Sequence, residues 1–378
     1  MDSIDLIAII ILLGIAQGFF MGTFLLFTRG PNARANRFLG ILFCSFSMSI
    51  VHFFLDRTGL YAQYPHLMRT SIPVLFLFGP LFYFYVRILT QRTTRLRWVH
   101  LLHAVPFTLA VLMFLPFYLS SAEVKLQGAR DIAGYLVSPV WHLFSTLQVI
   151  HLFAYMIAVR RILGRYNERI RNTQSSIERI NLRWLLIGNN LFFFVFGLIL
   201  LLIFLQALGV PTLGVYSISV PLIVTVIIYG LGFWGLRQPD IFSPAEDVAA
   251  RKYEKSALTP PLTKELAEKV QAFMAAQKPY LNTELTLPML AGQLNIPQHQ
   301  LSQVINEAIG LNFFDFVNGH RVEEAKRLLL DPAKGSYTVI AIAVEAGFNS
   351  KSAFNAVFKK QTGQTPSEFR QKAQKGTA

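Results

Sequence analysis

A short segment near the C-terminus, residues 350–362, carries polar side chains along one face. With a helical period of 3.6 residues, Phe354, Val357 and Phe358 fall together on the opposite, apolar face. The polar face holds Ser350, Lys351, Ser352, Asn355, Lys359 and Lys360. Asn pairs with the edge of adenine, Lys with guanine and Ser with several bases, whereas Lys359 and Lys360 are better placed for phosphates. The segment therefore predicts recognition of double-stranded DNA.

The neighbouring elements predict how this face is held. Apolar residues at helical spacing predict a first short helix: Val339, Ile342, Ala343 and Ala346. Gly347 ends that helix, because the turn that follows needs a positive φ without a Cβ clash. Gly363 ends the polar helix, and Thr365, Pro366 and Glu368 then predict a capping box that starts another one. Two short helices around a glycine turn form a helix-turn-helix.

Characteristic residues run through this stretch at a defined spacing: Ile342-Ala343, Gly347-Phe348, Ser350, Ser352, Phe354, Phe358-Lys359-Lys360, Gly363, Thr365-Pro366 and Arg370. At these positions the chain resembles the AraC/XylS family of bacterial transcription regulators, and the resemblance covers about residues 263 to 372. It implies two helix-turn-helix units joined by a long helix. The two recognition helices would then enter successive major grooves about one turn (~34 Å) apart.

The same pattern occurs a second time, earlier in the chain. At an offset of 52, Leu290-Ala291, Leu294 and Ile296 correspond to Ile342-Ala343, Ala346 and Phe348. At an offset of 53, Leu301, Ile305, Gly310 and Phe316 correspond to Phe354, Phe358, Gly363 and Phe369. One extra residue in the second turn accounts for the change. A first recognition helix is thus predicted at about 298–307, with a joining helix at about 313–330.

The outward face of the first recognition helix is also polar. It is predicted to carry His299, Ser302, Gln303 and Asn306, which we expect to meet base edges. Arg321 on the joining helix is a further candidate for a phosphate contact. Many members of the family carry arginine where this chain has Gln303 and Ala356. These departures predict weaker intrinsic affinity, compensated by dimerisation or by confinement to a membrane.

Composition predicts that most of the chain is not soluble. The 378 residues are 53% hydrophobic with a mean hydropathy of +0.43, which is typical of a membrane protein. Seven apolar segments are long enough to cross a bilayer. They lie at about 5–27, 38–55, 71–89, 98–119, 136–159, 185–206 and 214–236. A proline-containing polar linker at 238–262 separates them from a DNA-binding domain at 263–378, which begins with a helix at about 263–276.

Positive charge in the loops predicts the orientation of these spans. The loops after the first, third and fifth spans carry 13 arginines, whereas the alternate loops carry four Lys or Arg residues. Cytoplasmic loops carry the positive excess, so the N-terminus is predicted outside and the C-terminus in the cytoplasm. The N-terminus lacks a basic region, which excludes a secretory signal. The predicted location is the bacterial inner membrane, with the DNA-binding domain on the side of the chromosome.

Glycines on the first span leave two interpretations open. Gly14, Gly18 and Gly22 form a small-residue stripe, because they recur every four residues. Such a stripe lets helices approach closely, either between two copies of the chain or inside one bundle. His100 and His103 lie one turn apart and could share a ligand, although hydrogen bonding between helices is the favoured role. We expect no metal and no cofactor.

The sequence predicts an all-α protein with a seven-helix transmembrane bundle, residues 1–237, followed by a cytoplasmic domain of two helix-turn-helices. No Walker A, HExxH or nucleophile-elbow motif is present, so no enzyme is expected. The favoured function is a one-component transcription regulator whose bundle senses a small-molecule or envelope signal. Expected partners are promoter DNA, the lipid bilayer and a second copy of the chain, with RNA polymerase as a further candidate. The alternatives are a receptor or carrier with an accessory autoregulatory domain, and a bundle that only anchors.

Overall fold

The computed structural model describes residues 5–91, 97–130, 138–178, 180–210, 212–236 and 258–376. These residues are helical apart from turns and one isolated β-bridge, which confirms the all-α class. The chain divides into two compact units. One comprises Met1–Gly164 and Leu182–Asp240, and the other comprises Arg165–Asn181 and Ile241–Ala378. Most of the linker expected at 238–262 lies outside the described residues, which resume at residue 258.

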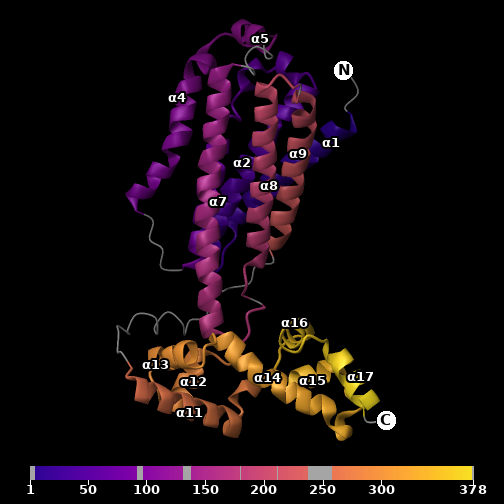
Figure 1. Ribbon diagram of the computed structural model, residues 1–378. Coiled ribbons are helices and arrows are strands. Elements are labelled where there is room, and N and C mark those ends of the chain that lie inside the picture. The colour runs from indigo at the N-terminus through magenta and orange to yellow at the C-terminus, as the bar shows by residue number, and fades with distance from the viewer. Residues whose placement is uncertain are drawn as a thin grey trace. The chain divides into compact units, whose positions relative to one another are not determined.

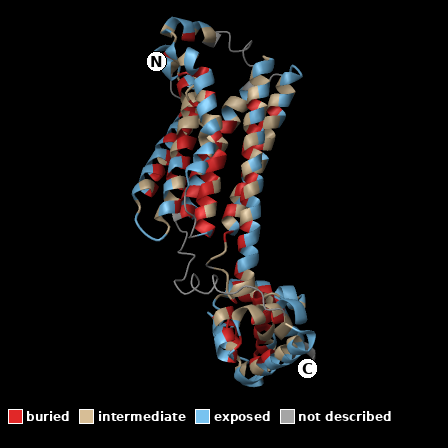
Figure 2. Cartoon of the chain, turned by 90° about the vertical axis from the view of Figure 1, so that its left-hand side faces the viewer, coloured by how far each residue is buried: buried red, intermediate tan, exposed pale blue. Residues whose placement is uncertain are grey.

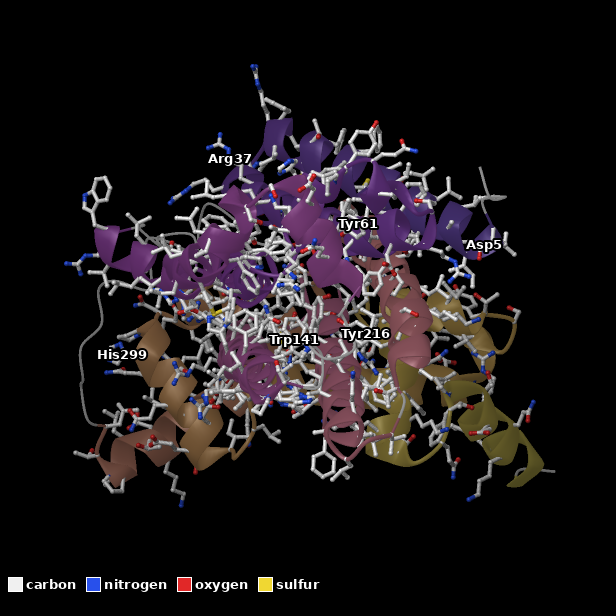
Figure 3. All side chains as sticks on the ribbon, turned by 90° about the horizontal axis from the view of Figure 1, so that it is seen from above. Asp5, Arg37, Tyr61, Trp141, Tyr216 and His299 are labelled. Atoms are coloured by element: carbon white, nitrogen blue, oxygen red, sulfur yellow. The ribbon has the colours of Figure 1, made fainter. Side chains whose placement is uncertain are left out.

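The first unit is a bundle of helices, the longest of which run along it side by side, while the short α5 (Ala122–Arg130) lies at one end (Figure 1). The other helices are α1 (Leu6–Phe27), α2 (Ala33–Arg57), α3 (Leu75–Thr90), α4 (Val105–Leu119), α7 (Pro139–Thr173), α8 (Arg183–Ala207) and α9 (Leu213–Leu236). Short turns of helix, η1 (Leu60–Ala62), η2 (Pro65–Leu67) and η3 (Trp98–Ala104), join some of them. Asp5 caps the start of α1 and pairs with Arg57 (Figure 3).

Among the described residues, six helices are long and apolar enough to cross a membrane, one fewer than expected. The missing one is α3, which has 16 residues and is therefore about 24 Å long. Its expected start at residue 71 falls in turns, because the chain enters α3 through Pro73 and the helix begins only at Leu75. In contrast, α7 continues to Thr173, well past the expected end at residue 159.

The glycine stripe on α1 packs inside this unit. A Cβ on Gly22 would lie 2.8 Å from the carbonyl oxygen of Gly40 on α2, and one on Gly14 would meet Thr225 on α9. Gly18 faces Ser47, whose hydroxyl donates to the carbonyl oxygen of Ile15 at 3.0 Å. Of the two interpretations, the structure shows close packing between helices of the same chain. The glycines therefore offer no free surface for a second copy.

The helices of the first unit carry exposed residues along their outer sides (Figure 2), and many of these residues are large and apolar. Large side chains that are more than half exposed occur on α1, α8 and α9, among them Leu6, Phe20, Phe194 and Val226. Interior polar groups have partners in several places. His103 on η3 bonds the hydroxyl of Tyr155 on α7, as expected for a histidine that joins two helices. Lys125 is fully buried, and its ammonium donates to two backbone carbonyls and to His66.

The second unit has a helix, α14 (Phe313–Leu330), through its middle with further helices on both sides (Figure 1). The other elements are α11 (Pro260–Gln277), η4 (Pro279–Leu281), α12 (Leu287–Leu294), α13 (Gln298–Gln303), η5 (Val304–Ala308), η6 (Pro332–Lys334), α15 (Val339–Glu345), α16 (Lys351–Thr362) and α17 (Pro366–Gly376). Pro260 and Pro261 begin α11 instead of breaking a linker, since proline suits the first turn of a helix.

Two separate apolar cores lie along α14. One joins the first half of α14 to α11, α12 and α13, with Val270, Leu290 and Val317 inaccessible to solvent. The other joins the second half of α14 to α15, α16 and α17, with Val322, Phe354 and Phe358 inaccessible. The domain therefore consists of two helix-turn-helix units that share one helix.

Candidate nucleic-acid interface

The second helix-turn-helix has the geometry that its sequence predicts. Thr338 caps α15, and Gly347 then turns the chain with φ at +87°. The hydroxyl of Ser350 accepts from the backbone N–H of Ala353 at 3.1 Å, which caps α16. Phe354 packs into the core at the inner side of α16. The hydroxyl of Ser350 is thus engaged in the cap, which leaves it a smaller share in any DNA contact.

The outer side of α16 gathers the remaining predicted contacts. Lys351, Ser352, Lys359 and Lys360 are exposed, and Asn355 between them is half-buried. The ammonium of Lys360 lies 3.1 Å from Asp315 at the start of α14. A duplex phosphate could therefore draw Lys360 from a weak surface ion pair, because such pairs contribute little stability.

The first helix-turn-helix has the same plan with a different turn and a different second helix. Asn295 takes the place of glycine, with φ at +53°. α13 starts without a side-chain cap and passes into a π-helical turn, in which the N–H of Ile309 donates to the carbonyl of Val304 at 3.1 Å. The recognition helix expected at 298–307 is therefore wider in its second half. Such turns are often found at functional sites.

The predicted DNA contacts of the first helix-turn-helix lie together on α13 and η5. Asn306 is exposed, and its amide donates to the backbone oxygen of Ser302 at 2.8 Å. Gln303 donates to the carboxylate of Glu307 at 2.8 Å. His299 is half-buried on α13 (Figure 3). The first helix-turn-helix thus presents polar side chains without a lysine or arginine, where the second helix-turn-helix presents lysines.

Helix boundaries confirm the internal repeat and extend it. α12 and α15 begin 52 residues apart, at Leu287 and Val339, whereas α13 and α16 begin 53 apart, at Gln298 and Lys351. The turns after the recognition helices also match, because Gly310 and Gly363 have φ values of +77° and +76°. Beyond them Asn312 caps α14, and Thr365 forms the predicted capping box with Glu368. These caps are a correspondence that the apolar pattern alone does not reveal.

Arg321 does not lie on the surface, which corrects its predicted role as a phosphate contact. Its side chain is 1% exposed. It donates to the carbonyl oxygens of Tyr280 at 2.7 Å, Asn282 at 2.7 Å and Ser175 at 3.1 Å. Burial lowers the pKa of its guanidinium to about 10, so it stays charged at neutral pH. Arg321 is an internal brace of the domain.

The sequence analysis also missed Asp315, which organises charge between the elements. Its carboxylate pairs with Arg171 at 2.9 Å and with Lys360 at 3.1 Å, and it accepts from the amide of Asn312. Burial of the carboxyl works against ionisation, but the bonds from Lys360 and Asn312 and the charge of Arg171 outweigh it and lower the pKa. Asp315 thus remains an anion that two cations share.

Charge is distributed unevenly between the two units. From Pro279 to Asn312 the chain has no Lys or Arg. From Gly347 to the C-terminus there are six basic residues and one acidic residue. The electrostatic attraction for a nucleic acid is thus concentrated on the second unit.

Comparisons with known proteins agree with this geometry. Residues 290–372 match the family model described as a helix-turn-helix domain. Uncharacterized HTH-type transcriptional regulators of Staphylococcus aureus strains COL and MSSA476 are each 33% identical over 91 residues. Those residues are 24% of this chain and 12% of each relative. No solved structure matches the chain.

These findings define the class of the C-terminal domain. It is an AraC-type helix-turn-helix domain, homologous to that of HTH-type transcriptional regulators. These similarities support DNA binding by this domain. The family match does not extend to the apolar helices that precede it.

Proposed function

We propose that the protein is a membrane-embedded one-component transcription regulator. The observation that carries the proposal is the occurrence, within the described part of one chain, of two matched helix-turn-helices and six helices long enough to cross a bilayer. The apolar side chains exposed on the first unit suit contact with lipid and would be costly in water. Residues 1–237 form the membrane domain in this proposal, residues 238–262 the linker and residues 263–378 the DNA-binding domain.

The two recognition helices share the work of binding. On α16, Asn355 and Ser352 contact base edges, while Lys359 and Lys360 contact phosphates. On α13 and η5, His299, Ser302, Gln303 and Asn306 contact a second half-site. The domain lies in the cytoplasm of a bacterium and the N-terminus outside, as the loop arginines indicate. This orientation needs an odd number of crossings, so the shorter apolar helix α3 crosses the bilayer as well. A signal received in the bundle then changes occupancy of a promoter.

DNA binding is tested with the full-length protein in lipid nanodiscs. We expect it to select, from a random library of double-stranded DNA, two half-sites whose centres lie one helical turn apart. A variant with Asn355→Ala and Asn306→Ala serves as a control for retention through charge alone. Recovery of the same sequences by this variant would show that the assigned residues do not read DNA. Recovery of no sequence by the native protein would contradict sequence-specific binding.

Orientation is tested separately in cells. A reporter that is active only in the periplasm should be silent when it is fused after Arg237 and active when it is fused near Glu123. The reason is the excess of arginine in the loops that we assign to the cytoplasm. Reversed signals would place the helix-turn-helices away from the chromosome and would overturn the proposal.

A further inference from the structure

The segment Arg165–Asn181 is part of the DNA-binding unit although it lies far from it in the sequence. Its first residues form the last turns of α7, and α8 starts at Arg183, directly after it. It therefore connects two of the helices that are long enough to cross a membrane. Its contacts with residues 258–376 all lie within the second compact unit.

Ser175 is the centre of these contacts and is 1% exposed. Its backbone N–H donates to the carbonyl of Leu285 at 3.2 Å, just before α12. Its carbonyl accepts from Asn318 at 3.0 Å and from Arg321 at 3.1 Å, both on α14. Its hydroxyl accepts from Arg321 at 3.0 Å. Buried polar groups need such partners, so Ser175 and Arg321 satisfy one another.

The segment contacts both helix-turn-helices. On one side Gln174 forms an antiparallel bridge with Thr286, the residue that caps α12. On the other side Ser176 accepts from Asn349 in the turn before α16, and Ile177 packs against the second apolar core. Apart from this segment, the two cores are joined through α14 and through the turn at Gly347, which lies against the backbone of Tyr280 and Leu281. Residues 174–177 thus connect the first helix-turn-helix to the second.

Charge links the segment to a residue that we assign to DNA. Asp315 pairs with Arg171 of the segment and also with Lys360 of α16. When Lys360 moves to a phosphate, Arg171 keeps the partly buried carboxylate of Asp315 paired. Without Arg171, that carboxylate would hold Lys360 more strongly, because an unpaired buried charge is costly. The docked segment therefore favours the DNA-competent arrangement.

We propose that Arg165–Asn181 is the transmitter between the apolar helices and the DNA-binding domain. When it is docked around Ser175, it holds the two recognition helices in the arrangement that fits two half-sites. Movement of α7 and α8 withdraws it and lowers affinity for paired half-sites, because each unit must then be ordered separately on DNA. This inference rests on the proposed function and specifies how it is regulated.

The test compares variants of the full-length protein in nanodiscs on two DNA probes. The first probe is the paired half-site sequence that the native protein selects from a random library, and the second has one half-site scrambled. Arg171→Glu with Ile177→Asp should undock the segment and lower affinity for the paired probe about tenfold or more, because the binding of two linked sites is lost. Affinity for the scrambled probe should fall by a clearly smaller factor, since there only the phosphate contact of Lys360 is weakened. Arg169→Glu, at an exposed position on the same segment, is the matched control and should bind both probes normally.

A disulfide shows whether docking itself restores binding. Ser176→Cys and Asn349→Cys, in a Cys44→Ser background, place two thiols where the side chains now touch. Oxidation should restore most of the affinity that Arg171→Glu with Ile177→Asp loses, and reduction should remove it again.

Three results would overturn the inference. Normal binding of the undocked variant to the paired probe would mean that the segment does not set affinity, and tighter binding would mean that it blocks DNA. Equal losses on both probes that oxidation does not restore would mean that the segment only supports folding. If the native protein selects no DNA sequence at all, the proposed function fails, which is a distinguishable result.

Discussion

The two helix-turn-helices of the second unit share a plan but differ in how firmly their turns are specified. Gly347 takes a φ of +87°, and a Cβ there would lie 2.9 Å from the Cα of Leu281. Asn295, its counterpart, takes a φ of +53° and keeps an exposed side chain. Asn tolerates the left-handed region, whereas a crowded turn tolerates only glycine. The turn of the second helix-turn-helix is thus closely constrained, and the turn of the first is more adaptable.

Charge follows the same division. The first helix-turn-helix offers amides, a hydroxyl, an imidazole and the carboxylate of Glu307, while the second offers Lys351, Lys359 and Lys360 on its exposed face. Of the two copies of the motif, the second is therefore suited to phosphate attraction and the first to contacts with base edges. We expect the second helix-turn-helix to anchor the protein on DNA and the first helix-turn-helix to add sequence selectivity.

The largest difference between the two helix-turn-helices should be seen in the free energy of unfolding when the turn residue of each one is substituted. Gly347→Ala introduces a Cβ against the backbone at a positive φ, so we expect the free energy of unfolding of the domain to fall by about 3–5 kcal/mol. Asn295→Gly, the matched change, should stay within about 0.5 kcal/mol. Pulse proteolysis of the protein in nanodiscs measures both. Equal losses would show that the two turns are equally constrained.

Substitution of Arg321, the internal brace of the domain, should have the next largest effect. Arg321→Met leaves the carbonyl oxygens of Tyr280, Asn282 and Ser175 without their donor. We expect a loss of about 2–4 kcal/mol in the free energy of unfolding, measured by the same proteolysis. The dependence of DNA binding on salt should not change, because a buried guanidinium displaces no counterion from DNA. A reduced salt dependence would restore Arg321 to the interface.

Local sequence signals made much of the DNA-binding domain predictable. The expected joining helix, 313–330, has the observed bounds of α14, because Asn312 caps its start and the apolar spacing continues to its end. The capping box at Thr365 and the turn at Gly347 were likewise readable, since each depends on residue types within a few positions. Caps and turns are encoded by neighbours in sequence.

The features that could not be predicted depend on distant partners. The acceptors of Arg321 come from residues 175, 280 and 282, so no local pattern distinguishes it from a surface arginine. The arginines after residue 159 end an apolar run, but arginine is a good helix former and α7 continues through them. The third apolar run, in contrast, contains turns before α3 begins at Leu75. Hydropathy therefore estimates apolar length better than helix length.

Substitutions of residues that contact bases should distinguish the two helix-turn-helices by a smaller difference, in the free energy of DNA binding. Asn355 and Ser302 occupy equivalent positions, 53 residues apart, on the two recognition helices. Asn355→Ala should cost about 1–3 kcal/mol on the selected DNA and relax preference at one base pair, because an amide can make two bonds to adenine. Ser302→Ala should cost less, since a hydroxyl discriminates weakly. Equilibrium binding to the selected DNA and to its single-base variants gives both values, and equal losses on random DNA would contradict a role in readout.

The smallest expected effect concerns phosphate attraction, and a pair of equivalent residues tests it directly. Lys360 and Glu307 are 53 residues apart, and both are exposed at the ends of their recognition helices. If the second unit is the anchor, Lys360→Ala should weaken binding to all sequences alike and reduce the slope of log K against log salt by about one. Its ion pair with Asp315 is exposed on the lysine side, so the change should leave folding almost intact. Glu307→Lys should do the reverse, because it removes a repulsive carboxylate and adds a cation beside the same duplex. We expect a slope steeper by about one and tighter binding to random DNA, without a new base preference. Titrations on random duplex at several salt concentrations measure both slopes. If Glu307→Lys leaves the slope unchanged, the end of η5 does not approach a phosphate, and the first unit must lie on DNA differently from the second.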